Sequence, residues 1–166
     1  MTSTTTNLSL DEIFNLAKAA LLNNGANEEN ADAVATTVTN AERDGSVSHG
    51  LFRIPGYIKA LQSNKVDGSA KPEIEEVTPT IFRCDAQNGF APLAHKYGIK
   101  KLIEAANAFG IAGLAIKRCH HFAALWPEVE AISDHGLVGL TSVSYTPAVA
   151  PSGGAEALFG TNPIAF

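Results

Sequence analysis

The sequence predicts an α/β protein with a helical N-terminal part, residues 1–70, and a mixed α/β segment, residues 71–166. Apolar residues recur at helical spacing through the first third of the chain, whereas short apolar runs alternate with helical patterns after it. The composition, 45% hydrophobic and 17% charged, supplies enough apolar side chains for a core. We therefore expect helices first and βαβ units after them.

The boundaries of the predicted helices in the first part follow from capping and turn residues. Ser9 stands three residues before Glu12, which is capping-box spacing, and Asn27 can cap a second helix. Pro55 either kinks or restarts a third one. The predicted helices span residues 9–25, 27–45 and about 48–63.

The second part alternates between two kinds of pattern. Its predicted strands span residues 73–77, 80–84, 111–116 and 137–144, and its predicted helices span residues 92–110 and 123–136. Asn88 and Gly89 form a turn pair. The last strand–helix–strand run has apolar strands, which is typical of buried strands in parallel sheets.

Composition excludes several classes of function. The net charge is −5 without a run of Lys or Arg, so the sequence predicts no nucleic-acid-binding face. No apolar run has the length of a membrane span, and the N-terminus lacks the pattern of a signal peptide. The spacing of Cys84 and Cys119 suits free thiols in a reducing cytoplasm. The apolar end, residues 164–166, predicts a strand that continues in a longer protein, with a short docked final strand as the alternative.

The stretch SVSHGLFRIPGY, residues 46–57, is the first candidate site. If Ser48 caps a helix, His49 lies in the first turn and Arg53, four residues on, points to the same face. A helix N-terminus and a guanidinium both bind anions, and a histidine exchanges protons near neutral pH. The pattern suits proton transfer on a small carboxylate, or equally a capped helix start with a surface His and Arg.

A second candidate, KRCHHFAALWP, follows the predicted strand 111–116. Ligands bind at the carboxyl ends of parallel strands, so His120 and His121 could line a pocket with Phe122 and Trp126. Adjacent side chains diverge, so we expect at most one of the two histidines to reach a substrate. The alternative is a loop with one histidine exposed and one packed. The spacing predicts neither a zinc site nor a pairing of Cys119 with a catalytic histidine.

The third candidate is the glycine-rich stretch PSGGAEALFGTNPIAF, residues 151–166. It matches neither the phosphate-binding Walker loop nor G-x-G-x-x-G, a pattern that the chain lacks throughout. A nucleotide site must therefore be of another kind or lie beyond residue 166. Thr161 and Asn162 could hydrogen bond to a ligand, and a plain turn is about as good an interpretation.

Three motifs in order, DGSVSHGLFRIPGY, HHFAALWP and LFGTNPIAF, resemble the type-2 malate/L-lactate dehydrogenases, which are unrelated to the Rossmann lactate dehydrogenases. The stretch CHHFAALWPEVE is most similar to the branch that reduces Δ1-piperideine-2-carboxylate and Δ1-pyrroline-2-carboxylate with NADPH. The resemblance covers essentially the whole chain, and members of the family are roughly twice this length, a size in keeping with more than one domain.

The resemblance implies roles for particular residues. His49 would be the family's catalytic histidine with Ser48 as its hydrogen-bonding neighbour, and Arg53 would bind the substrate carboxylate. His121 would line the substrate or nicotinamide pocket, with Thr161 near the substrate. His120 would be on the cofactor side. The family's aspartate that orients the histidine, and most of the cofactor site, would lie past residue 166. Residues 71–166 would be the first part of the family's own non-Rossmann dinucleotide-binding fold.

The function that the resemblance implies is reduction of a cyclic imine carboxylate to L-pipecolate or L-proline, with NADPH, or NADH as the alternative, and without a metal. One alternative is a malate-, lactate- or ureidoglycolate-type 2-hydroxy acid dehydrogenase of the same family, and the pattern of His120, Phe122 and Trp126 argues against it. Another is a non-catalytic fragment or dimerisation module. The expected setting is a cytoplasmic enzyme of amino-acid metabolism, either a homodimer or joined to a companion chain that supplies the missing half.

Overall fold

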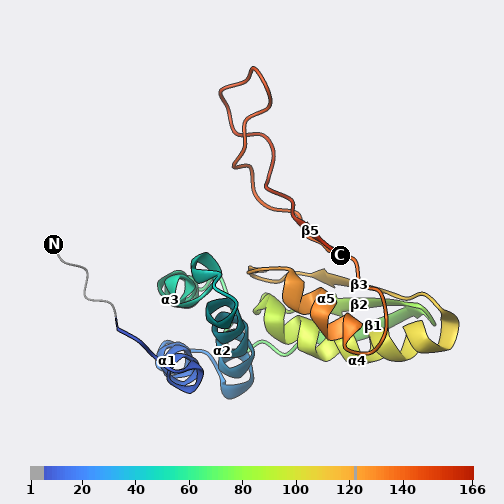
Figure 1. Ribbon diagram of the computed structural model, residues 1–166, viewed down its shortest axis with the longest axis horizontal. Helices are drawn as coiled ribbons and strands as arrows, with labels where there is room; N and C mark the ends of the chain where they lie inside the picture. Colours follow the sequence, from blue (N-terminus) through green and yellow to red (C-terminus); the bar gives the residue numbers. More distant parts are fainter. Residues whose placement is uncertain (1–5, 122) are drawn as a thin grey trace.

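The computed structural model describes residues 6–121 and 123–166 and confirms the predicted α/β class. Figure 1 shows helices α1 to α3 at one end of the molecule and a small sheet with α4 and α5 at the other. The segment after β4 (Thr141–Ser142) extends away from the body as an arm and returns to β5 (Ile164–Ala165). Phe122, which we expected in the pocket, lies outside the described residues.

The first two helices form where the capping signals place them. Helix α1 (Leu10–Leu22) has the full capping box of Ser9 and Glu12, and α2 (Glu28–Arg43) is capped by the Asn27 side chain. Gly45 follows the end of α2 with φ +74°, a conformation that glycine adopts without strain. These boundaries confirm the predicted helices.

The predicted helix 48–63 is wrong in its first turn and a half. Two 3₁₀ turns, η1 (Val47–His49) and η2 (Leu51–Arg53), precede the α-helix α3 (Ile54–Gln62). Pro55 lies in the first turn of α3, where its missing N–H costs nothing, so the proline starts the helix rather than kinking it. Ser48 lies inside η1 and therefore does not cap a helix.

The sheet is built around one parallel crossover. Strand β1 (Glu73–Thr78) pairs antiparallel with β2 (Ile81–Asp85), and β2 pairs parallel with β3 (Gly113–Lys117) across α4 (Ala91–Phe109). The βαβ unit is therefore β2–α4–β3. A side chain at Gly98 would collide with Leu114, so this glycine lets α4 lie close to β3.

The prediction of a buried strand over 137–144 is wrong. After α5 (Trp126–Ser133), only β4 (Thr141–Ser142) is extended and paired, and its partner is β5 (Ile164–Ala165), antiparallel and outside the main sheet. Val138 and Leu140 are 80% and 70% exposed. These apolar residues have the composition of a buried strand, but no element of the described chain covers them.

The main core joins the helices to the α/β part. It contains small and aliphatic residues of α1, α2 and α3 together with Phe90, which directly precedes α4. A smaller cluster around Cys84 and Ala94 lies between the sheet and α4. None of the helices in the described ranges has the length and apolar character needed to cross a bilayer.

Candidate active site

The two 3₁₀ turns that carry the first motif are held from α2. One oxygen of the Glu42 carboxylate accepts a hydrogen bond from the backbone N–H of Leu51 at 2.7 Å. A Cβ atom at Gly50 would collide with the Glu42 side chain, so glycine is required for this close approach. The turns therefore have a fixed position relative to α2, and His49 and Arg53 with them.

His49 is anchored at one ring nitrogen. Its Nδ1 lies 3.1 Å from the hydroxyl of Ser46 and 3.1 Å from that of Ser48. Burial, and secondarily the charge of Arg53, lower the pKa of His49 below 6.5, so the ring is mostly neutral at pH 7. Ser48 is thus a hydrogen-bonding neighbour of His49, but Ser46 is an equal one that the sequence did not indicate.

Arg53 lies beside His49 through a backbone contact rather than a shared helical face. Its Nε donates to the carbonyl of Ser48 at 2.7 Å. This bond leaves the two terminal nitrogens of the guanidinium, and no carboxylate of the described residues forms an ion pair with them. A half-buried guanidinium with this free end can bind a carboxylate in a bidentate way.

His121 reaches the same place from the loop after β3. Its Nδ1 lies 3.0 Å from the hydroxyl of Tyr57, a buried residue of α3. Burial, with smaller contributions from Arg53 and the neighbouring histidines, lowers the pKa of His121 to about 4. Burial raises the pKa of Tyr57 to about 12, so both groups are neutral at pH 7. Tyr57 was missed in the sequence, although it stands four residues after Arg53.

The two adjacent histidines do not diverge as we expected. His121 has φ +49°, an uncommon left-handed conformation for a residue other than glycine. Both rings lie against Tyr57, with centroid distances of 5.5 Å for His121 and 6.4 Å for His120. His120 also packs edge-on against Phe90, and burial, then Lys65, lowers its pKa.

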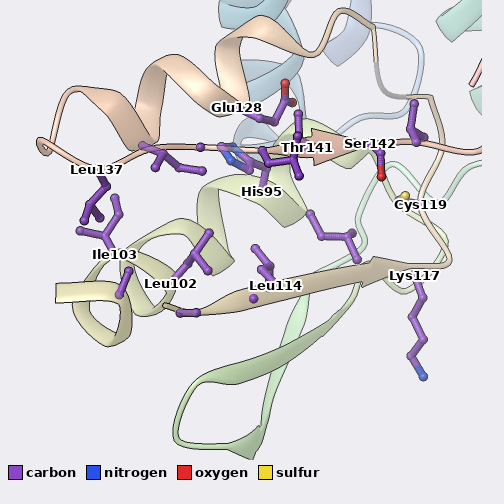
Figure 2. A pocket seen from close by; sticks show the side chains of 18 of the residues that line it. His95, Leu102, Ile103, Leu114, Lys117, Cys119, Glu128, Leu137, Thr141 and Ser142 are labelled. Atoms are coloured by element: carbon purple, nitrogen blue, oxygen red, sulfur yellow. The ribbon is translucent and has the colours of Figure 1, made fainter. Parts of the chain in front are cut away.

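A cavity of about 1030 Å³ extends from His120 and His121 along β3, between α4, α5 and the segment 136–146. Figure 2 shows that apolar side chains, such as Leu114 and Leu137, form most of its wall. Two ionisable groups of this wall, Glu128 and His95, are half-buried. Burial raises the pKa of Glu128 to about 7 and lowers that of His95 to about 4.

The cations that line this cavity are already paired. The side chains of Lys117 and Arg118 contact the Asp85 carboxylate at 3.2 Å and 2.9 Å. The cavity therefore offers an apolar wall and three imidazoles, those of His95, His120 and His121, but neither of these cations is free for a phosphate group.

Thr161 is exposed in the arm, and no hydrogen bond found within the described residues connects it to His49 or Arg53. Its place near a substrate stays a prediction. Within residues 6–121 and 123–166, no group of three or more His, Cys, Asp and Glu side chains is arranged to hold a metal ion.

A free guanidinium end beside neutral imidazoles, at the junction of a helical part and an α/β part, suits an enzyme that acts on a small carboxylate. The chain belongs to the malate/L-lactate dehydrogenase family, whose model matches residues 8–166.

Named relatives of known class are similar over nearly the whole chain. The Δ1-pyrroline-2-carboxylate/Δ1-piperideine-2-carboxylate reductase of Pseudomonas syringae pv. tomato is 46% identical over 162 residues, which are 98% of this chain and 47% of the relative. The Δ1-pyrroline-2-carboxylate reductase 1 of Burkholderia ambifaria is 45% identical, covering 96% of this chain and 47% of that protein. The chain spans about half the length of the curated relatives it matches.

Solved structures agree with this placement. The crystal structure of Δ1-piperideine-2-carboxylate reductase from Pseudomonas syringae matches with a TM-score of 0.91 and 45% identity, over 96% of this chain and 48% of that one. Malate dehydrogenase from Entamoeba histolytica matches with a TM-score of 0.89 and 30% identity, over 97% and 45% of the two chains. The predicted resemblance is confirmed, and the similar enzymes are oxidoreductases.

Proposed function

We propose that this chain carries the substrate-binding half of a reductase that converts Δ1-piperideine-2-carboxylate or Δ1-pyrroline-2-carboxylate into L-pipecolate or L-proline. The observation that carries the proposal is that His49 and Arg53, from the two consecutive 3₁₀ turns, lie close to His121, from the loop after β3, so that the charge of Arg53 lowers the pKa of both histidines. The names of the reductase relatives support the substrate class.

In the proposed mechanism the free end of the Arg53 guanidinium binds the substrate carboxylate. Bound NADPH, or NADH, would supply the hydride for the imine carbon. That carbon is electrophilic when the ring nitrogen carries a proton, and His49 supplies or guards this proton. A carboxylate on Arg53 also offsets the charge that lowers the pKa of His49, which favours the protonated imidazole when the substrate is present.

The residues of this chain fit one end of the cofactor only. The cavity beside His120 and His121 is apolar and wide enough for a nicotinamide ring, which supports a place for that ring there. The paired state of Lys117 and Arg118 indicates that the phosphates would be held elsewhere. We infer that a companion polypeptide, or a second subunit, provides that part, Thr161 serving near the substrate. The free thiols Cys84 and Cys119 support a cytoplasmic location.

The test of the site uses the active assembly with the cyclic imine. Replacing His49 by Ala should lower turnover by about two to four orders of magnitude and remove the pH dependence near its titration. An unchanged pH profile in the His49→Ala variant would transfer the proton role to another group, with His121 next.

The competing function is oxidation of a 2-hydroxy acid, which the similarity to malate dehydrogenase favours. The same His49 would then take the hydroxyl proton. Turnover with the cyclic imine and NADPH, compared with turnover with malate or lactate and the oxidised cofactor, decides between the two. Faster turnover of the hydroxy acid would refute the imine assignment.

The proposal that this chain is half of an active enzyme has its own test. Calorimetry of the isolated chain with NADPH should show no measurable binding, and the chain should not reduce the imine. A companion polypeptide should restore both. Tight stoichiometric binding or turnover by the isolated chain would contradict the division of the site, and absence of activity in every assembly would favour a non-catalytic module.

A further inference from the structure

The ring of His49 lies against a residue from the far part of the chain. The centroids of the His49 imidazole and the Trp126 indole are 6.4 Å apart and their planes meet at 82°, an edge-to-face arrangement. Trp126 is the first residue of α5 and the one tryptophan in the sequence. The proposed function assigns no task to it.

The indole is fixed at its N–H by a carboxylate at the end of α2. Nε1 of Trp126 donates to one oxygen of Asp44 at 3.0 Å. Arg43 binds the same carboxylate through two hydrogen bonds, of 2.7 and 2.9 Å. The hydrogen bonds from Arg43, and to a lesser degree the one from Trp126, lower the pKa of Asp44, so the carboxylate is ionised at neutral pH. An ionised acceptor makes the stronger kind of hydrogen bond.

We propose that Asp44 is a positioning residue for His49: it holds the Trp126 indole, and the indole holds the imidazole against the hydroxyls of Ser46 and Ser48. The proposal rests on the proton role of His49 in the proposed function. The terminal torsion of a histidine side chain is soft, so hydrogen bonds at Nδ1 alone leave the ring free to swing. An edge-to-face neighbour removes this freedom and keeps Nε2 aimed in one direction.

The hydrogen bond between Asp44 and Trp126 also connects two distant segments of the chain. Asp44 ends α2 and Trp126 begins α5, so one hydrogen bond joins the helical part to the α/β part beside the site. If α5 moved, the indole would leave the imidazole. The order of α5 is thereby coupled to the orientation of the proton-transfer group.

The contact between His49 and Trp126 can be followed by fluorescence without substrate, because Trp126 is the one tryptophan in the sequence. A protonated imidazole quenches a neighbouring indole, so the emission of the purified chain should fall as pH is lowered through the titration of His49. The other charged and titratable groups that act on this pair are Arg53, His121 and Asp44, and Asp44 is in turn bound by Arg43, which Glu130 approaches. A His49→Gln variant identifies which part of the change belongs to His49.

Two variants of the tether and one control variant should then separate positioning from general stability. Asp44→Ala should lose the part of the fluorescence change that depends on His49. Asp44→Asn keeps an acceptor oxygen and should retain most of that change. Glu75→Ala should behave as wild type. Glu75 is a matched control because it is an exposed carboxylate paired with an arginine, Arg83, at 3.1 Å.

The same variants are assayed for imine reduction in the active assembly. Because misplacement of a catalytic group by about 1 Å costs about a hundredfold, Asp44→Ala should lower kcat by about 10- to 100-fold with little change in KM. Asp44→Asn should lie within about threefold of wild type, since a neutral acceptor keeps roughly half of the bond strength.

An Asp44→Ala variant that keeps both the His49-dependent fluorescence change and its kcat would overturn the proposal. So would an Asp44→Asn variant that folds but resembles Asp44→Ala in both measurements. If wild type and Asp44→Asn show the fluorescence coupling and Asp44→Ala loses it, but no assembly reduces the imine, the contact stands and the proposed function fails.

Discussion

Replacing Gly50 by Ala should disturb the site through Glu42. A Cβ atom at residue 50 would lie 2.7 Å from Cγ of Glu42 and closer still to its carboxyl group, so the Glu42 side chain must move. It would then lose its 2.7 Å hydrogen bond from the N–H of Leu51. A hydrogen bond to a charged group contributes about 1.5–3 kcal/mol, and we expect the free energy of unfolding to fall by about 2–3 kcal/mol. For a chain of this size that corresponds to a melting temperature lower by about 5–10 °C.

Gly56 is the matched control for this experiment. It lies in α3, and a Cβ atom there would meet nothing within 4 Å. Gly56→Ala should therefore raise the free energy of unfolding by about 0.5–1 kcal/mol, because alanine loses less backbone entropy in a helix. Thermal and urea unfolding of both variants give the comparison. Equal midpoints for the two would refute the packing of Gly50 on Glu42.

Glu42→Gln tests the same contact if Gly50→Ala does not fold. Glu42→Gln keeps an oxygen that can accept from Leu51 but removes the charge, so we expect a smaller loss, of about 1 kcal/mol. In the active assembly both Gly50→Ala and Glu42→Gln should lower turnover more than Gly56→Ala does, because only they loosen the turn that carries His49. The reverse order of turnover would contradict that reasoning.

Three further outcomes are expected. Arg53→Lys should weaken imine binding about 30-fold and leave cofactor binding unchanged, since it removes the fork but not the charge, and equal losses in titrations of both ligands would refute the carboxylate role. Tyr57→Phe should cost about 1–2 kcal/mol in urea unfolding, because it leaves Nδ1 of His121 without its partner, and an unchanged midpoint would show that the bond contributes nothing. Glu128 has a pKa raised to about 7 from 4.5, so the folded state loses stability as pH rises through this range. Glu128→Gln should therefore stabilise the isolated chain by roughly 2 kcal/mol at pH 8 and hardly at pH 5, and a gain that is the same at both pH values would show that the carboxyl is not held neutral.

The fold was predictable where its signals are local. Ser9, Glu12 and Asn27 cap helices through bonds that span three residues, so their spacing alone locates the helix starts. The segment 137–144 shows the opposite case. The apolar composition of this segment predicts that Val138 and Leu140 are buried, but it does not identify the element that would bury them. In the described chain both side chains are exposed. Burial depends on a neighbour that the local pattern does not contain.

The sequence indicated the residues of the first candidate site, but the geometry that it predicted for them was wrong. His49 and Arg53 are four residues apart, which suggested one face of an α-helix. In the structure the chain forms two 3₁₀ turns there, and Arg53 is held by the carbonyl of Ser48. The contacts that complete the site, from Tyr57 to His121 and from Trp126 to His49, span 64 and 77 residues, and no spacing rule reaches so far.

Proline is a signal that could have located more of the site. Helices α3, α4 and α5 all carry a proline at their first or second position, so the residues one or two positions before each proline stand at a helix start. Arg53, Phe90 and Trp126 are such residues, and each contacts or lies beside the histidine group. Three helix N-termini therefore approach the same place. A helix N-terminus favours a bound anion, as the charge of Arg53 does, so this arrangement agrees with the proposed binding of a carboxylate.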